Sequence, residues 1–112
     1  MLIHEILSES QTQRMAERQK QLVAAKKSLY AGDLDSALDS MAELSYLGYP
    51  QQGISAFFDR NEKRVKPLVM AMVKSNEDPV RIYNVTGRLI QSMRVDWSWL
   101  YTVRQAAKQQ LN

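Results

Sequence analysis

The chain of 112 residues contains no cysteine, and its only histidine is His4. Without cysteine it can form no disulfide, no thiolate nucleophile and no cysteine-ligated zinc site. A single histidine leaves too little material for a Ser-His or Cys-His nucleophilic pair, and no other ligand-type residue stands at motif spacing around it. Carboxylates one helical turn apart, such as Asp35 and Asp39, are typical of a solvated face. We therefore expect a protein that is not an enzyme and uses no metal or cofactor.

Glycine and long apolar runs are also scarce. The four glycines are too dispersed to form a phosphate-binding loop. No apolar run approaches the roughly 20 residues that span a bilayer. The apolar opening of the chain is interrupted by His4 and Glu5 before the apolar region of a signal peptide could form. These absences predict a cytoplasmic protein with no membrane contact.

The overall composition is that of a folded domain. Apolar residues make up 45% of the chain and charged residues 24%, which is typical of globular proteins. We expect one domain over residues 1–112, with residues 1–10 as a flexible N-terminal arm. Lys and Arg number 15 against 12 Asp and Glu, so the protein is basic with a net charge of +3. This excess permits a phosphate-bearing partner without requiring one.

The spacing of the apolar residues predicts an all-α fold, a small bundle of four or five helices. The strongest pattern covers residues 79–111, where one apolar stripe follows the helical period. Asp78 suits the cap of this helix and Pro79 its first position, where no backbone donor is needed. We expect this segment to form the main wall of the core.

Two features leave other arrangements of the wall segment open. Asp96 could cap a second helix, which would divide the segment in two. Residues 80–95 are β-branched and aromatic enough to form a hairpin around a Thr-Gly turn. The fold would then be α+β.

The middle of the chain carries two more helical patterns, at residues 34–47 and 54–74, with a loop over residues 49–53 between them. Pro67 lies inside the second pattern, where it removes a backbone hydrogen bond and clashes with the preceding turn. We therefore expect two short helices there, or one helix kinked at Lys66.

The N-terminal part predicts a helical hairpin. Residues 11–21 are nearly all polar, and Met15 and Ala16 are their only apolar members. Gly32 is placed to end the first helix in a left-handed conformation, and Asp33 to cap the next one. Because only these two residues separate the patterns, the two helices should pack antiparallel.

Two short stretches resemble known families. Ala31-Gly-Asp-Leu-Asp-Ser-Ala37 resembles the helix-turn-helix junction of a tetratricopeptide repeat. The resemblance covers this junction only, because Gln21 stands where the repeat has a large apolar residue and no second copy follows. The opening Met1-Leu-Ile-His-Glu-Ile6 is similar to tailed-phage gene products, which implies a phage structural or host-interaction protein.

The absence of catalytic material favours a binding function, and we predict a non-catalytic helical protein–protein interaction module that self-associates. Met15, Leu22 and Leu29 recur at seven-residue spacing, which is the register of a helical seam. Trp99 lies off the core stripe, and exposed tryptophans are common centres of interfaces. These four residues are the candidate interface with a protein partner or a second copy.

The alternative function is that of a small basic nucleic-acid-binding protein. Basic side chains gather in three groups, on the first helix, in the middle of the chain and along the wall segment. A solvated face with ion pairs would give the same pattern. The candidate phosphate contacts are Arg14, Arg18, Lys20, Lys26, Lys27, Arg60, Lys63, Arg64, Arg81 and Arg88.

Overall fold

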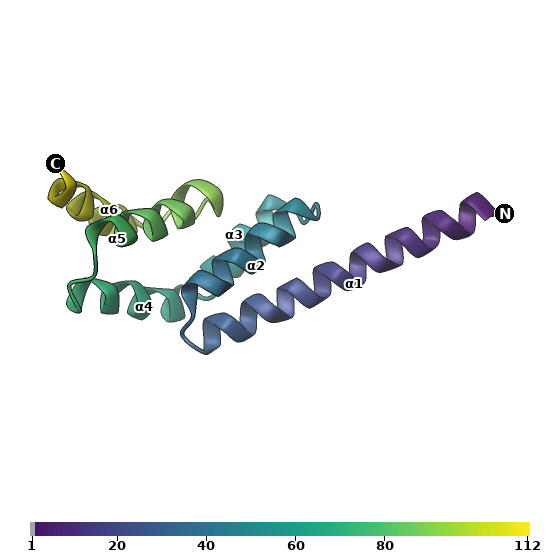
Figure 1. Cartoon of the computed structure of the whole chain (residues 1–112), viewed down its shortest axis with the longest axis horizontal. Helices are drawn as coiled ribbons and strands as arrows, with labels where there is room; N and C mark the ends of the chain where they lie inside the picture. The colour runs from purple at the N-terminus through teal and green to yellow at the C-terminus, as the bar shows by residue number, and fades with distance from the viewer. Residues whose placement is uncertain (1) are drawn as a thin grey trace.

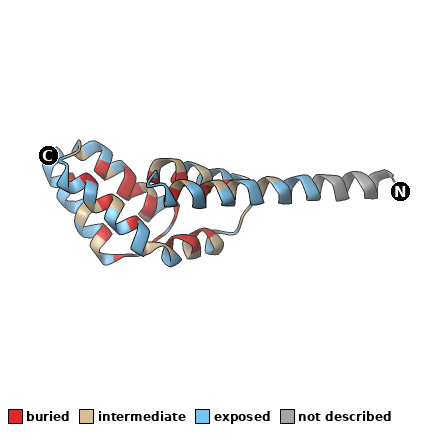
Figure 2. Cartoon of the chain, turned by 90° about the horizontal axis from the view of Figure 1, so that it is seen from below, coloured by how far each residue is buried: buried red, intermediate tan, exposed pale blue. Residues whose placement is uncertain are grey.

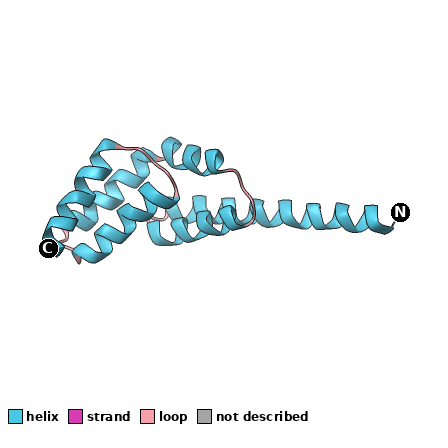
Figure 3. Cartoon of the chain, turned by 90° about the horizontal axis from the view of Figure 1, so that it is seen from above, coloured by secondary structure: helices cyan, strands magenta, loops and turns pink. Residues whose placement is uncertain are grey.

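The computed structural model describes the backbone of residues 2–112 and the side chains of residues 11–112. Every regular element in this part of the chain is helical (Figure 3), so the predicted all-α bundle is confirmed and the alternative β-hairpin at 80–95 is wrong. In chain order the elements are α1 (Leu2–Tyr30), α2 (Leu34–Tyr46), α3 (Gln51–Arg60), α4 (Glu62–Lys74), α5 (Pro79–Gly87), the π-helical turn η1 (Arg88–Ser92) and α6 (Ser98–Leu111). The described residues thus form six α-helices where the sequence predicted four or five.

The molecule is elongated, with principal extents of 61 × 26 × 21 Å. α1 is its longest element, and the N-terminal half of α1 extends away from the other helices (Figure 1). Buried residues gather where the helices pack, whereas the described side chains on the projecting part of α1 are mostly exposed (Figure 2). The predicted flexible arm, residues 1–10, lies outside the described side chains.

The N-terminal hairpin forms as predicted. Gly32 has a φ of +84°, a left-handed conformation that glycine adopts without strain, and it ends α1. The Asp33 carboxylate then accepts hydrogen bonds from the Ser36 backbone N–H at 3.1 Å and the Ser36 hydroxyl at 2.7 Å, which caps α2. Ala25 and Leu29 on α1 are buried in the same core as the apolar face of α2.

The middle of the chain forms two short helices, as the first of the two predicted alternatives had it, and they meet at Asn61. The other alternative, one helix kinked at Lys66, is wrong, because Lys66 lies inside α4. The Asn61 side-chain amide donates to the Phe57 carbonyl at 2.7 Å, and its backbone N–H donates to the Phe58 carbonyl at 2.9 Å. These bonds end α3, and the Asn61 carbonyl accepts the first bonds of α4, from the backbone N–H groups of Arg64 at 2.9 Å and Val65 at 3.0 Å. Pro67 lies inside α4 and is exposed, so water can solvate the carbonyl that it leaves without a donor.

The wall segment is divided into α5 with η1 and α6, as the alternative start near Asp96 suggested. Asp96 itself is exposed and does not cap α6, because Trp97 takes the position before the first turn. The loop between them is held by Ser55, whose hydroxyl donates to the Met93 carbonyl at 2.9 Å. The predicted stripe is buried at Ile82, Val85, Leu89, Met93, Trp97, Leu100 and Ala107.

Candidate functional site

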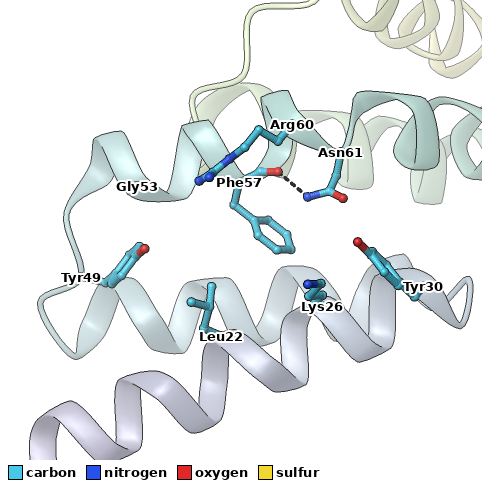
Figure 4. A pocket seen from close by; sticks show the side chains of 8 residues that line it. All are labelled: Leu22, Lys26, Tyr30, Tyr49, Gly53, Phe57, Arg60 and Asn61. Atoms are coloured by element: carbon cyan, nitrogen blue, oxygen red, sulfur yellow. Dashed lines mark hydrogen bonds between the residues drawn. The ribbon is translucent and has the colours of Figure 1, made fainter.

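A groove lies between α1 and α3 on the N-terminal side of the bundle (Figure 4). It has a volume of about 350 Å³, which is at the small end of the range for ligand sites. α1 supplies one wall and α3, with the residues at its two ends, supplies the other. The lining residues are Leu22, Lys26, Tyr30, Tyr49, Gly53, Phe57, Arg60 and Asn61.

Helical spacing explains why these side chains share one groove. Leu22, Lys26 and Tyr30 follow each other at steps of four on α1 and therefore lie on one face. Gly53 and Phe57 have the same spacing on α3. The groove is thus built from two facing helical stripes.

Tyr49 and Gly53 fit each other closely at one end of the groove. A Cβ atom on Gly53 would lie 2.6 Å from Cε1 of Tyr49, which is too close for a real contact. Glycine therefore lets the tyrosine ring lie directly on the first turn of α3. The sequence had predicted a loop over residues 49–53, whereas the helix begins at Gln51.

Phe57 is the most buried part of the groove, with 7% of its surface exposed. Its ring packs edge-on against Phe58, with a centroid distance of 5.3 Å and an interplanar angle of 87°. The Asn61 side-chain amide donates its hydrogen bond to the Phe57 carbonyl, as described above. Figure 4 shows the Phe57 ring between the two walls, pointing from α3 toward α1.

The electrostatic character of the groove is basic. Lys26 and Arg60 line it, and no acidic residue does. The guanidinium of Arg64 lies 3.7 Å from the ring centroid of Tyr30, and the Lys26 ammonium lies 5.6 Å from the same centroid. These cation–π contacts hold positive charge at one end of an aromatic surface.

The structure separates the four predicted interface residues. Met15 is 67% exposed on the projecting part of α1, and Leu22 lines the groove. Leu29 is 2% exposed and belongs to the core of the hairpin, so the prediction that it faces a partner is wrong.

Trp99 is also committed to contacts within the chain. Its ring stacks on Trp97 with a centroid distance of 5.6 Å, and its indole N–H donates to the Glu62 carboxylate at 2.7 Å. The Trp97 indole donates to Asp59 at 3.1 Å. The two tryptophans therefore hold the start of α6 against the junction of α3 and α4. Trp99 remains half-buried, and its role at an interface stays a prediction.

Three of the predicted phosphate contacts are engaged inside the bundle. Arg81 forms ion pairs with Asp35 at 2.8 Å and Glu77 at 2.6 Å, and the hydrogen bonds that it donates to Glu77 and then to Asp35 raise the pKa of Arg81 above its ordinary value. Arg88 pairs with Asp39 at 2.9 Å. Arg18 donates from Nε to the Leu47 carbonyl at 2.9 Å. These contacts hold α5, η1 and α1 against α2, and the carboxylates offset the charges of Arg81 and Arg88 in the basic group along the wall segment.

The remaining basic candidates are more exposed. Lys26, Arg60 and Arg64 are brought together at the groove, although they come from three different helices. The other members of the predicted set lie exposed on α1 and α4, namely Arg14, Lys20, Lys27 and Lys63.

Within residues 11–112, no group of three or more His, Cys, Asp or Glu side chains is arranged to hold a metal ion. Among the helices that the structure describes, none is long and apolar enough to cross a membrane.

The groove was not predicted from the sequence, because its second wall, Tyr49, Gly53 and Phe57, was divided between a predicted loop and a core stripe. The step of four between these residues was the available signal.

No protein-family model, no curated protein and no solved structure matches this chain.

Proposed function

We propose that this protein is a non-catalytic helical protein–protein interaction module that self-associates through α1. The observation that carries the proposal is the projection of α1 beyond the bundle. From Leu2 to Ala16 the helix runs 15 residues before Glu17, the first half-buried position among its described side chains. At 1.5 Å per residue this is about 22 Å of helix.

A helix of that length and composition has little to stabilise it in isolation. Isolated helices shorter than about 12–15 residues are marginal in water, and most helical stability in proteins comes from packing. Residues 11–16 are all exposed, and Met15 places a large apolar side chain among them. Packing against a second copy would cover this side chain and stabilise the projecting half.

The sequence also predicted a cellular compartment and a phage origin, and both belong to this proposal. A chain without cysteine is compatible with the cytoplasm, which is the compartment we propose. The similarity of residues 1–6 to tailed-phage gene products makes a phage structural or host-interaction protein one form of this binding function.

Sedimentation equilibrium over a wide concentration range tests the proposal. We expect the average mass to rise from monomer toward dimer, and Met15→Glu to abolish the rise because it places a charge where an apolar contact is needed. Val73→Glu is the matched control, since Val73 is an exposed apolar residue at the far end of α4. A monomer at every concentration would remove self-association from the proposal.

The second candidate function is nucleic-acid binding, and the cations around Tyr30 favour it. Aromatic faces next to basic side chains bind single-stranded nucleic acid. However, Arg64 already covers the ring of Tyr30, and Arg81 and Arg88 are paired with carboxylates. Fluorescence polarisation with a labelled oligonucleotide at increasing salt tests this candidate, because phosphate contacts lose affinity steeply as salt rises. Absence of binding at low salt would eliminate it.

A further inference from the structure

A second cavity, the α5–α6 cavity, lies at the end of the molecule opposite the projecting half of α1 (Figure 1). Its volume is about 400 Å³, which is within the range of small-ligand sites. α6 contributes Arg104, whereas α5 and η1 contribute Asn84, Arg88, Gln91 and Ser92. Among the described residues that line it, none is acidic. The cavity therefore combines two arginines with three other side chains that can donate hydrogen bonds.

Arg104 lacks a hydrogen-bond acceptor inside the protein. Its guanidinium carries five N–H donors, and its Nε atom is buried with no hydrogen-bond partner among the described residues. The guanidinium lies 4.0 Å from the ring centroid of Tyr83, but this cation–π contact supplies no acceptor oxygen. The ion pairs within residues 11–112 belong to Arg81 and Arg88. Because an unpaired buried donor of a charged group costs free energy, an acceptor from outside the chain would stabilise Arg104.

Arg88 gives the cavity its second positive charge. Its Nη2 atom donates to the Asp39 carboxylate at 2.9 Å, which uses one of the five donors of the guanidinium. The Asp39 side chain is 72% exposed, so water weakens this ion pair. Two arginines stand against this single carboxylate, and the remaining positive charge favours an anionic ligand.

The π-helical turn η1 adds polar side chains to the same wall. In this turn the Met93 backbone N–H donates to the Arg88 carbonyl, five residues earlier, at 3.0 Å. Gln91 and Ser92 follow Arg88 on η1, and both are exposed where they line the cavity. Turns of this kind are rare and often occur at functional sites.

We propose that the α5–α6 cavity binds the phosphate group of a small molecule. This function is independent of self-association through α1. The planar guanidinium of Arg104 matches two oxygens of a phosphate or a carboxylate. A phosphate has further oxygens, which can accept from Asn84 and Gln91 on the opposite wall, whereas both oxygens of a carboxylate are used by the arginine. The two walls together therefore favour phosphate.

An NMR titration with inorganic phosphate tests the site, because the Nε–H group of an arginine gives its own nitrogen–proton signal. At neutral pH and constant ionic strength, with sodium chloride as the balancing salt, we expect the Arg104 Nε signal to shift and to saturate. Acetate should bind at least about tenfold more weakly. An Arg104 signal that stays in place would overturn the inference. Acetate that binds as tightly as phosphate would overturn the assignment to a phosphate group.

A charge placed at the rim of the cavity tests its location. Gln91→Glu introduces a negative charge at an exposed lining residue and leaves the core unchanged. We expect it to raise the Kd for phosphate by about tenfold or more, because the new carboxylate repels the ligand. Gln19→Glu is the matched control, since Gln19 is exposed on α1, and its Kd should equal that of the wild type. An unchanged Kd in Gln91→Glu would overturn the site.

Two arginines that stack on tyrosines provide a second comparison. Arg64 lies 3.7 Å from the ring centroid of Tyr30, much as Arg104 lies on Tyr83. Arg104→Gln should raise the Kd for phosphate by at least about tenfold, whereas Arg64→Gln should leave it unchanged, although each variant loses one positive charge. Circular dichroism verifies folding, and Gln91→Glu decides the question if Arg104→Gln unfolds. An equal loss in both variants would overturn the inference, because binding would then follow net charge.

Two further titrations separate this inference from the proposed functions. We expect Met15→Glu to bind phosphate as tightly as the wild type, because the cavity does not depend on the contact through α1. A single-stranded oligonucleotide that shifts the Arg104 signal, when inorganic phosphate does not, would overturn the small-molecule ligand and assign the cavity to nucleic acid.

Discussion

Close contacts between single residues explain two glycines that lie inside helices. Gly53 leaves room for the ring of Tyr49, as described above. Gly87 leaves room for Arg104, since a Cβ atom there would lie 3.3 Å from both Nε and Nη2 of the guanidinium. The same guanidinium lies 4.0 Å from the ring centroid of Tyr83. Both glycines are therefore explained by a side chain that packs on the backbone.

The contact between Tyr49 and Gly53 predicts that Gly53→Ala has opposite effects on the stability of the protein in the presence and in the absence of the tyrosine ring. In a helix, alanine is more favourable than glycine by about 0.5–1 kcal/mol. We expect Gly53→Ala to destabilise the wild-type protein, because the new Cβ collides with the tyrosine ring. In a Tyr49→Ala background the same substitution should stabilise the protein by up to about 1 kcal/mol.

Urea unfolding of the four proteins in this double-mutant cycle measures both effects. If Gly53→Ala stabilises the protein equally in the wild-type and Tyr49→Ala backgrounds, the ring of Tyr49 moves away from the new Cβ at no cost in free energy. The groove would then lack the rigid tyrosine wall on which its shape depends.

At the scale of the element, α2 depends on its cap. The hydroxyl of Ser36 and then its backbone N–H donate to the carboxylate of Asp33, and these bonds hold the pKa of Asp33 below its ordinary value of 3.8. A carboxylate whose pKa is lowered by folding stabilises the protein above the unfolded-state pKa. That contribution is lost as the pH falls through the lower, folded-state pKa.

We therefore expect acidification from about pH 5 to about pH 3 to reduce the stability of the wild type more than that of Asp33→Asn. Asparagine also caps helices but does not titrate. The urea midpoints of the two proteins, measured across this range, provide the comparison. A constant difference between them would contradict a role for the charged carboxylate in the cap.

At the scale of the whole molecule, α1 has two parts with different surroundings. Its C-terminal half is packed in the hairpin, where Ala25 and Leu29 are buried, whereas residues 11–16 are exposed. Local stability follows packing, so the two parts should open independently.

Hydrogen exchange followed by mass spectrometry should show this difference. In dilute protein, we expect amides of residues 11–16 to exchange much faster than those of α2. Raising the protein concentration should slow exchange in residues 11–16 and leave α2 unchanged, because only the projecting part is covered by a second copy. Equal protection of both segments in dilute protein would mean that the projecting helix is stable alone.

The sequence by itself determined the helical architecture and much of the core. Gly32 and Asp33 specify their turn through local backbone and capping preferences, which need no distant contact. The stripe from Ile82 to Ala107 was predictable because apolar periodicity depends only on which side of a helix must be buried. The number of helices was harder to predict, since Asn61 ends α3 through ordinary hydrogen bonds that many residues could make.

Only the tertiary structure decided which residues form the candidate site. The groove joins Leu22 on α1 to Phe57 on α3, two positions whose proximity depends on how α2 places the helices around it. Trp99 was assigned to an interface because it lies off the predicted core stripe, yet its ring stacks on Trp97 and its indole donates to Glu62 on α4. Arg81 forms a local pair with Glu77 four residues before it, but its pair with Asp35 exists only because α2 brings Asp35 next to it. Periodicity reports which face of one helix is covered, whereas contacts between helices depend on distances that no single segment contains.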